Sequence, residues 1–324
     1  MQPVFTLTAD RQDITQAIRE RLISLKVTDE SGIQSDTLEI RLDDRDRSIR
    51  LPRTGAELSL HMGYDHQLTD IGLFVVDELV AEGPPDTLII RARAADFRQS
   101  LKARKSRSWD AVTLGDIVAT IASEHELTPR IPDELKTKVI AHIDQTDESD
   151  LHFLTRLSKQ YDAISSIKQG HLIFTERGKG RKVSGPPLPA IALKPEGLSR
   201  YRFAMADRGK YVAAIAHWYN NETAQKIPVR VGQSEGQPVY ALRGNQPDEE
   251  AAKTAARAKL DALARGTVTG QLTLPGNPTI KAESPLSLTG FREGIDGDWV
   301  VTRVEHNLGK SGFKTIATIE SLKK

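Results

Sequence analysis

Residues 109–129 read WDAVTLGDIVATIASEHELTP and open the one part of the chain in which a helical pattern dominates. Thr113 can accept a backbone N–H bond as an N-cap, and Asp116 three residues later completes a short form of the capping box. Apolar residues recur at helical spacing and form one stripe: Val112, Ile117, Val118, Ile121 and Ala122. The pattern predicts an amphipathic helix that ends at Thr128-Pro129.

A second helix is expected where the acidic segment 144–150, DQTDESD, leads into apolar sequence. Its four acids and two candidate caps favour the positive end of a helix dipole. The apolar face of this helix comprises Leu151, Leu154, Leu157 and Tyr161. Residues 163–177 then alternate around the turn Gln169-Gly170 and predict a hairpin. We therefore expect residues 98–185 to form an α/β insert of two helices and a hairpin.

A β-rich region precedes this insert. Residues 22–94 are a series of short alternating runs that end in turn signals, and Leu38, Ile40 and Leu42 form one such run. Evenly spaced strands with one apolar face are typical of an antiparallel barrel or sandwich. The insert therefore follows a first β-rich body.

A second β-rich region runs from Ser199 to Leu322 and is expected to close into a small barrel. An Ala-rich helix at residues 248–265 interrupts it, with Asp248 as its cap and Gly266 as its stop. The segment GPPLP at 185–189 precedes this region and predicts a domain boundary, because prolines stiffen a linker and do not join a central strand. The chain is thus expected to be an α+β, mainly β protein with domains at 1–97, 98–185 and 186–324.

The charges of the chain nearly balance, with 45 Lys and Arg against 44 Asp and Glu. No overall field therefore points to nucleic acid, an anionic membrane or an acidic substrate. The absence of cysteine excludes disulfides, thiolate nucleophiles and thiolate metal sites. The first residues lack the pattern of a cleaved signal, and no apolar stretch is long enough to span a bilayer. We expect a soluble chain that does not insert into a membrane.

The sequence contains no motif with the spacing of a known catalytic or metal site. The eight histidines are spread along the chain, and none has a spacing such as His-Glu-x-x-His. His125 and His152 fall on the expected helices, where a lone histidine is usually structural. The segment 144–150 lacks the glycine and the terminal glutamate of an EF-hand loop. We predict no catalytic residue, no metal and no cofactor, although two carboxylates suited to glycoside hydrolysis can still meet in space.

Two weaker patterns point to other functions. A basic run without any acid comprises Arg98, Lys102, Arg104, Lys105 and Arg107. No aromatic side chain interleaves this run, which favours a solvated face or a partner contact over a nucleic-acid patch. Residues 113–127 are similar to a short pattern of the peptidoglycan-binding LysM module, which any capped amphipathic helix also matches. A cell-wall-binding or cell-wall-degrading tail protein and a DNA-bound regulator are therefore the alternatives.

Several stretches of the sequence, in chain order, resemble one known family. They are FVVDEL at 74–79, AADFR at 94–98, SWDAVTLGDI at 108–117, IDQTDESDLHFL at 143–154, GF at 290–291, GIDG at 294–297 and RVEH at 303–306. The family is that of the late control gene D proteins, the tail hub proteins of contractile-tailed phages and phage-tail-like bacteriocins. The stretches span nearly the whole chain, which argues against chance.

The resemblance implies a structural hub of a contractile injection machine, with no enzymatic activity. Each subunit of such a hub carries two β-barrel domains similar to the tail-tube fold. A homotrimer then presents six barrels in a pseudo-six-fold ring and adapts the six-fold tail tube to the three-fold central spike. The implied partners are other copies of the chain, the spike, the tail tube protein and other baseplate proteins, with the tape measure protein as a further candidate.

The resemblance also implies a place in the baseplate of a virion or bacteriocin particle that is assembled in the bacterial cytoplasm. It transfers no catalytic, cofactor or metal residues, and it implies no specific binding of nucleic acid. Individual residues of the partner interfaces are not predicted.

Overall fold

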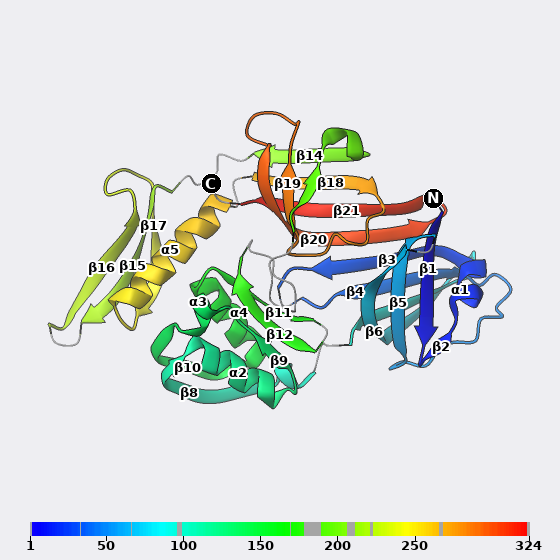
Figure 1. Cartoon of the computed structure of the whole chain (residues 1–324). Coiled ribbons are helices and arrows are strands. Elements are labelled where there is room, and N and C mark those ends of the chain that lie inside the picture. The colour runs from blue at the N-terminus through cyan, green and yellow to red at the C-terminus, as the bar shows by residue number, and fades with distance from the viewer. Residues whose placement is uncertain are drawn as a thin grey trace.

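The structure is a computed structural model dominated by β-strands (Figure 1). It describes residues 2–32, 34–65, 67–95, 99–168, 170–177, 189–205, 211–220, 223–265 and 268–322. Two β-rich bodies are joined edge to edge in one 13-stranded sheet, and an α/β insert separates them in sequence. The α+β, mainly β fold class expected from the sequence is therefore confirmed. No helix of the described residues is long and apolar enough to cross a membrane.

The first body follows the alternation seen in the sequence. Its elements are β1 (Pro3–Ala9), β2 (Gln12–Asp13), α1 (Thr15–Arg21), β3 (Leu22–Glu30), β4 (Thr37–Asp43), β5 (Glu57–Tyr64), β6 (Gln67–Glu82) and β7 (Thr87–Ala94). The strands pair in the order β3-β4-β7-β6-β5-β1-β2. Leu38, Ile40 and Leu42 point into one core because alternate residues of a strand share a face.

The second body contains the C-terminal strands. Its elements are β13 (Ile191–Leu193), the 3₁₀ turn η2 (Pro195–Gly197), β14 (Arg200–Met205), β18 (Val268–Pro275), β19 (Pro285–Leu288), β20 (Gly297–Gly309) and β21 (Gly312–Ser321). The strands pair in the order β13-β19-β20-β21-β18-β14. Residues 303–309 of β20 also pair antiparallel with residues 24–30 of β3, and this pairing joins the two bodies.

The two bodies share one strand order. Taken along the chain, β1, β3, β4, β5, β6 and β7 correspond to β13, β14, β18, β19, β20 and β21, and each corresponding pair has the same neighbours within its own body. Both β6 and β20 contain a bulge, the first after Val76 and the second after Val301. One difference is that β1 pairs antiparallel with β5, whereas β13 pairs parallel with β19.

Backbone details support this correspondence. Gly72 of β6 lies opposite Leu60 with a φ of 141°, and Gly297 of β20 lies opposite Leu288 with a φ of 135°. These left-handed values favour glycine in both strands. The N–H of Gly55 donates to the Val76 carbonyl at 2.7 Å, and the N–H of Glu283 donates to the Val301 carbonyl at 2.8 Å. The two bodies are therefore structural repeats of one unit.

A smaller α/β unit is inserted between β14 and β18. It consists of β15 (Ala213–Asn220), β16 (Gln225–Gly232), β17 (Val239–Gln246) and α5 (Glu249–Arg265). The predicted helix is present, and Asp248 caps it by accepting the Ala251 N–H at 2.7 Å. Its three strands pair with one another in a separate sheet that packs on α5, so the insertion is larger than the helix alone. Gly266, the expected stop, lies outside the described residues.

The insert between the two bodies has its own core. Its elements are the 3₁₀ turn η1 (Gln99–Lys102), β8 (Arg104–Thr113), α2 (Leu114–Glu124), β9 (Thr128–Arg130), α3 (Asp133–Lys136), β10 (Val139–Ser149), α4 (Asp150–Gln160), β11 (Ala163–Lys168) and β12 (His171–Glu176). The capping box of Thr113 and Asp116 is confirmed. Helix α2 ends at Glu124, before the predicted Thr128-Pro129, which belongs to a short strand parallel to β12.

The acidic segment 144–150 differs from the prediction. Only Asp150 is helical, Ser149 is the N-cap of α4, and residues 144–149 belong to strand β10. This strand pairs with β8, which carries most of the basic run. Opposite charges on paired strands favour the strand over an early helix start. The proline-rich boundary at 185–189 lies outside the described residues except for its last position.

Candidate functional site

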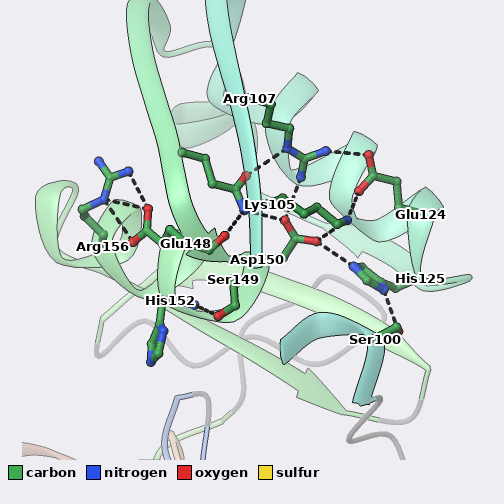
Figure 2. Close-up of polar contacts among 11 residues, drawn as sticks. Ser100, Lys105, Arg107, Glu124, His125, Glu148, Ser149, Asp150, His152 and Arg156 are labelled. Atoms are coloured by element: carbon green, nitrogen blue, oxygen red, sulfur yellow. Dashed lines mark hydrogen bonds and ion pairs between the residues drawn. The ribbon is translucent and has the colours of Figure 1, made fainter. Parts of the chain in front are cut away.

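The carboxylate of Asp150 is fully buried at the start of α4, and four polar side chains surround it (Figure 2). Its Oδ1 accepts hydrogen bonds of 2.7 Å from Arg107 Nη2 and 2.9 Å from Gln145 Nε2. Its Oδ2 accepts a 2.7 Å bond from Lys105 Nζ and lies 2.8 Å from His125 Nε2. One carboxylate thus binds side chains of β8 and β10 and of His125, the residue that caps the end of α2.

The local structure explains how these side chains meet. Lys105 and Arg107 are two residues apart in β8 and therefore project from the same face. Both also bind Glu124 at the end of α2, whose Oε1 accepts from Arg107 at 2.6 Å and whose Oε2 accepts from Lys105 at 2.7 Å. The pairing of β10 with β8 is irregular between Gln145 and Glu148, and the Gln145 side chain there is fully buried. We call Lys105, Arg107, Glu124, His125, Gln145 and Asp150 the Asp150 cluster.

The charges of the Asp150 cluster balance. Burial by itself raises the pKa of Asp150, but hydrogen bonds, first that of His125, hold the pKa below its ordinary value. Burial likewise opposes ionisation of Glu124, whose pKa is lowered by the hydrogen bonds of Lys105 and Arg107. The pKa of Lys105 is raised by the same carboxylates although burial works to lower it. Two carboxylates thus face the ammonium of Lys105 and the guanidinium of Arg107, and the pKa shifts of Asp150, Glu124 and Lys105 all favour the charged form.

Ser100 joins the Asp150 cluster through the histidine ring. Its Oγ lies 2.8 Å from His125 Nδ1, so Ser100, His125 and Asp150 are linked in the order of a serine hydrolase triad. However, His125 is only 4% exposed, and the carboxylate that would stabilise an imidazolium already holds two cations. This geometry fits the structural role predicted for His125 better than catalysis.

Three residues of the cluster have metal-ligand character. One ligand atom each of Glu124, His125 and Asp150 lie within 4.8 Å of one another. The Lys105 ammonium, however, bridges the two carboxylates at 2.7 Å from each and supplies the positive charge that a metal ion would bring. The donor set therefore does not fit a metal ion.

The basic run is a solvated face only in part, since Lys102 and Arg104 are exposed. Lys105 and Arg107 bind the buried cluster, and Arg104 pairs with Asp147 at 2.7 Å on the surface. The Arg107 guanidinium also lies over the Trp109 ring, 4.5 Å from its centroid. Lys105, Arg107 and Arg104 thus bind partners inside the insert. The alternation of Lys105 and Arg107 is the local feature of the sequence that indicates a strand. Arg98 lies outside the described residues.

The tryptophans take the places expected of core residues rather than of sugar or base platforms. Trp109 stacks on Phe153 with centroids 6.1 Å apart in the core of the insert. Trp299 is fully buried in the second body, and Trp218 packs partly buried beside β16 and α5. The helix with the LysM-like pattern likewise turns Ile117 and Val118 into the core of the insert.

A second ionic cluster lies where the insert meets both bodies. Lys168 of β11 binds Asp29 of β3 and lies 3.1 Å from Asp36 Oδ2. The other oxygen of Asp29 accepts the N–H of Ala282 from the second body at 2.9 Å. Burial, with the nearby Asp29 charge, raises the pKa of Asp36 to about 7. This cluster fixes three parts of the chain relative to one another.

The surface offers one large groove and a few exposed apolar side chains. The groove, about 1070 Å³ in volume, lies between β10 and α4 of the insert and helix α5. Among the exposed apolar residues, Tyr201 and Met205 lie together on β14, the strand at one end of the large sheet. Such residues at a free strand edge are typical of a contact with another protein chain. The sequence alone does not reveal such residues, because exposure depends on the pairing of distant strands.

Comparisons with known proteins identify the family. Residues 37–312 match the family described as phage tail baseplate hub (GPD). The chain is 37% identical over 362 residues to a probable baseplate hub protein of Escherichia phage 186, with 99% of this chain and 93% of that protein covered. A probable baseplate hub protein of Escherichia phage P2 is 35% identical over 361 residues, with the same 99% and 93% covered.

A solved structure shows the same fold. A tail protein from Neisseria meningitidis MC58 superposes with a TM-score of 0.73 at 11% identity, and 99% of this chain and 97% of that one are covered. The family model and the two phage relatives confirm the family resemblance noted in the sequence. The family match over residues 37–312, together with the two phage relatives, shows that this chain belongs to the phage tail baseplate hub family.

Proposed function

We propose that three copies of this hub form a closed ring of six β-rich bodies that adapts the six-fold tail tube to the three-fold central spike. The observation that carries the proposal is the internal repeat, because each chain contributes two bodies with one strand order. Three such chains give six nearly equivalent units with only three-fold true symmetry. One face of the ring would bind the last ring of tube protein, and the other face would bind the spike.

The proposed role is mechanical and involves no catalysis. The two clusters that most resemble chemical sites, around Asp150 and around Lys168, are occupied by their own ion pairs. The first holds the elements of the insert together, and the second holds the insert against both bodies, as a part that transmits contraction requires. We further propose that the ring is assembled in the bacterial cytoplasm with the spike, the tube and other baseplate proteins, and that it ends in the virion tail.

The mass of the purified chain in solution tests this function. Light scattering of the chain alone and with the candidate spike is expected to give a particle of three times 35.8 kDa that joins the spike as one complex. Formation of the trimer only in the presence of spike or tube would mean ordered assembly and would keep the function. A monomer that ignores both partners, or that co-sediments with purified peptidoglycan, would overturn it.

A further inference from the structure

The large sheet ends in a strand whose outer edge has no partner in the described chain. Strand β14 pairs with β18 on one side only. Its Tyr201 and Met205 are 50% and 55% exposed. Free edges with exposed apolar side chains favour pairing with another strand. A free edge of this kind leads to aggregation unless a specific strand covers it, so we expect β14 to have a defined partner.

A second free edge lies in the first body. The first half of β6 pairs with β5, and its second half pairs with β7 on the opposite side. Residues 78–82 consequently have β7 on one side and no described strand on the other. Leu79 and Val80 in this stretch are half-buried, and Glu78 and Glu82 are exposed.

The internal repeat shows which strand belongs on each free edge. In the repeat, β14 corresponds to β3, and β6 corresponds to β20. The strands β3 and β20 pair with each other across the two bodies of one chain. The same pairing between β14 and β6 would bring one free edge onto the other. Both strands belong to the same chain, so this contact must link two copies.

The register follows from the ladders within each body. Strands β6 and β20 align at their bulges, which places Leu79 at the position of Val304 and Glu82 at that of Asn307. Strands β14 and β3 align through β18 and β4, which places Met205 at the position of Asp29 and Arg202 at that of Lys26. Asp29 lies opposite Val304, and Lys26 lies opposite Asn307.

We propose that β14 of one copy pairs antiparallel with residues 79–82 of β6 in the next copy, and that this contact closes the ring. The register sets Met205 opposite Leu79, Ala204 opposite Val80, Phe203 opposite Ala81 and Arg202 opposite Glu82. This surface rests on the proposed three-fold ring and specifies where the copies meet. Each chain offers both strands, so head-to-tail contacts repeat until the ring closes.

The chemistry of the two edges is complementary. On one face of the predicted pair, Arg202 meets Glu82, and opposite charges directly across two strands stabilise the pairing. The contact inside the chain uses the same kind of pair, since Lys26 lies 3.5 Å from Glu305 and Arg303 lies 3.2 Å from Glu30.

The apolar face of β14 is also consistent with this partner. Leu25 of β3, at the position of Tyr201, is fully buried in a core that includes Leu308 and Phe313 of the other body. The neighbouring body covers Leu25 in this way, whereas the single chain leaves Tyr201 exposed. We expect the next copy to cover Tyr201 and Met205.

A pair of engineered cysteines tests the register. The chain has no cysteine of its own, so V80C and A204C introduce the only thiols. Directly opposite residues of antiparallel strands are close enough for a disulfide. Under mild oxidation the double variant is expected to run mainly as a covalent trimer on a non-reducing gel and as a monomer after reduction. The matched control is V80C with R200C, which the register places four residues apart, about 13 Å along the strand; it should stay uncrosslinked.

Light scattering of the unmodified chain separates the two proposals. A trimer together with a cross-linked double variant supports both, and a monomer whose double variant cross-links into trimers supports the surface with a weak affinity. A trimer in which V80C and A204C do not cross-link, or in which the control pair links equally, overturns this surface and keeps the ring. A chain that gives no cross-links and stays a monomer even with the spike and the tube protein present overturns both.

Discussion

A single buried carboxylate links four elements of the insert. Asp150 binds Arg107 and Lys105 at 2.7 Å each and has no exposed surface. Removing one partner of a buried ionic network typically costs about 3–5 kcal/mol, because the remaining charges lose their compensation. We expect Asp150→Asn to lower the free energy of unfolding by about 3 kcal/mol, measured by urea denaturation with tryptophan fluorescence.

The surface pair beside this cluster provides the control. Arg104 and Asp147 are 70% and 71% exposed in their side chains, and exposed pairs contribute little. Asp147→Asn should therefore change the free energy of unfolding by less than about 0.5 kcal/mol. Equal effects of the two substitutions would show that Asp150 is not the centre of a buried network.

Glu283 gives the fold a pH dependence of known sign. Burial raises its pKa to about 7, and its Oε2 is buried without a hydrogen-bond partner in the described residues. Because the pKa of Glu283 is raised in the folded state, the stability that its protonated form contributes is complete below pH 4.5. This contribution is lost as the pH rises through 7. Glu283→Gln, which stays neutral, should stabilise the protein by up to about 3 kcal/mol at pH 8 and by little at pH 4.

Thermal unfolding at several pH values, compared with the unmodified chain, measures this difference. Glu293→Gln, an exposed position of the same body, is the control and should give a difference that does not vary with pH. A constant difference for Glu283→Gln would mean that Glu283 ionises normally in the folded state.

At the scale of elements, the start of α2 is the feature that the sequence predicts best. Thr113 accepts the Asp116 N–H at 3.1 Å, and Asp116 accepts the Thr113 N–H at 2.8 Å. Loss of an N-cap side chain typically costs about 1 kcal/mol. We expect Thr113→Ala to destabilise the insert by about this amount in chemical denaturation. Thr120→Ala in the exposed middle of the same helix should be neutral or slightly stabilising, since alanine is the better helix former.

The same stretch shows where local sequence stops being informative. The capping box and the apolar stripe of α2 involve neighbours within one helix, so the sequence alone predicts them. The segment 144–149 looks like a helix start but forms a strand, because its partners in β8 lie about 40 residues earlier in the chain. Likewise, the basic residues of 104–107 have the pattern of a solvated face, but Lys105 and Arg107 bind carboxylates at the end of α2 and the start of α4. Tertiary pairing overrides a local charge pattern in both cases.

At the scale of the whole molecule, the sequence gives two β-rich regions and an insert but not how they connect. The pairing of β3 with β20 joins residues more than 270 positions apart, such as Val27 and His306, and no local pattern marks it. The two bodies share one strand order although the side chains at corresponding positions differ. For example, Leu38 of β4 corresponds to Gly270 of β18. The candidate interface follows only from this order.

The proposed contact at the edge of β14 leads to a prediction about assembly of the trimer. Met205 is 55% exposed in the single chain and is expected to lie against Leu79 of the next copy. An aspartate there would place an unpaired charge in an apolar contact, which costs at least about 1.4 kcal/mol and weakens each contact at least about tenfold. Met205→Asp should therefore shift the trimer toward monomers in sedimentation velocity over a range of concentrations. Val139→Asp changes a more exposed apolar residue, 74% exposed on β10 of the insert, and should leave the trimer intact. If Val139→Asp dissociates the trimer and Met205→Asp does not, the copies meet through the insert rather than through the ends of the sheet.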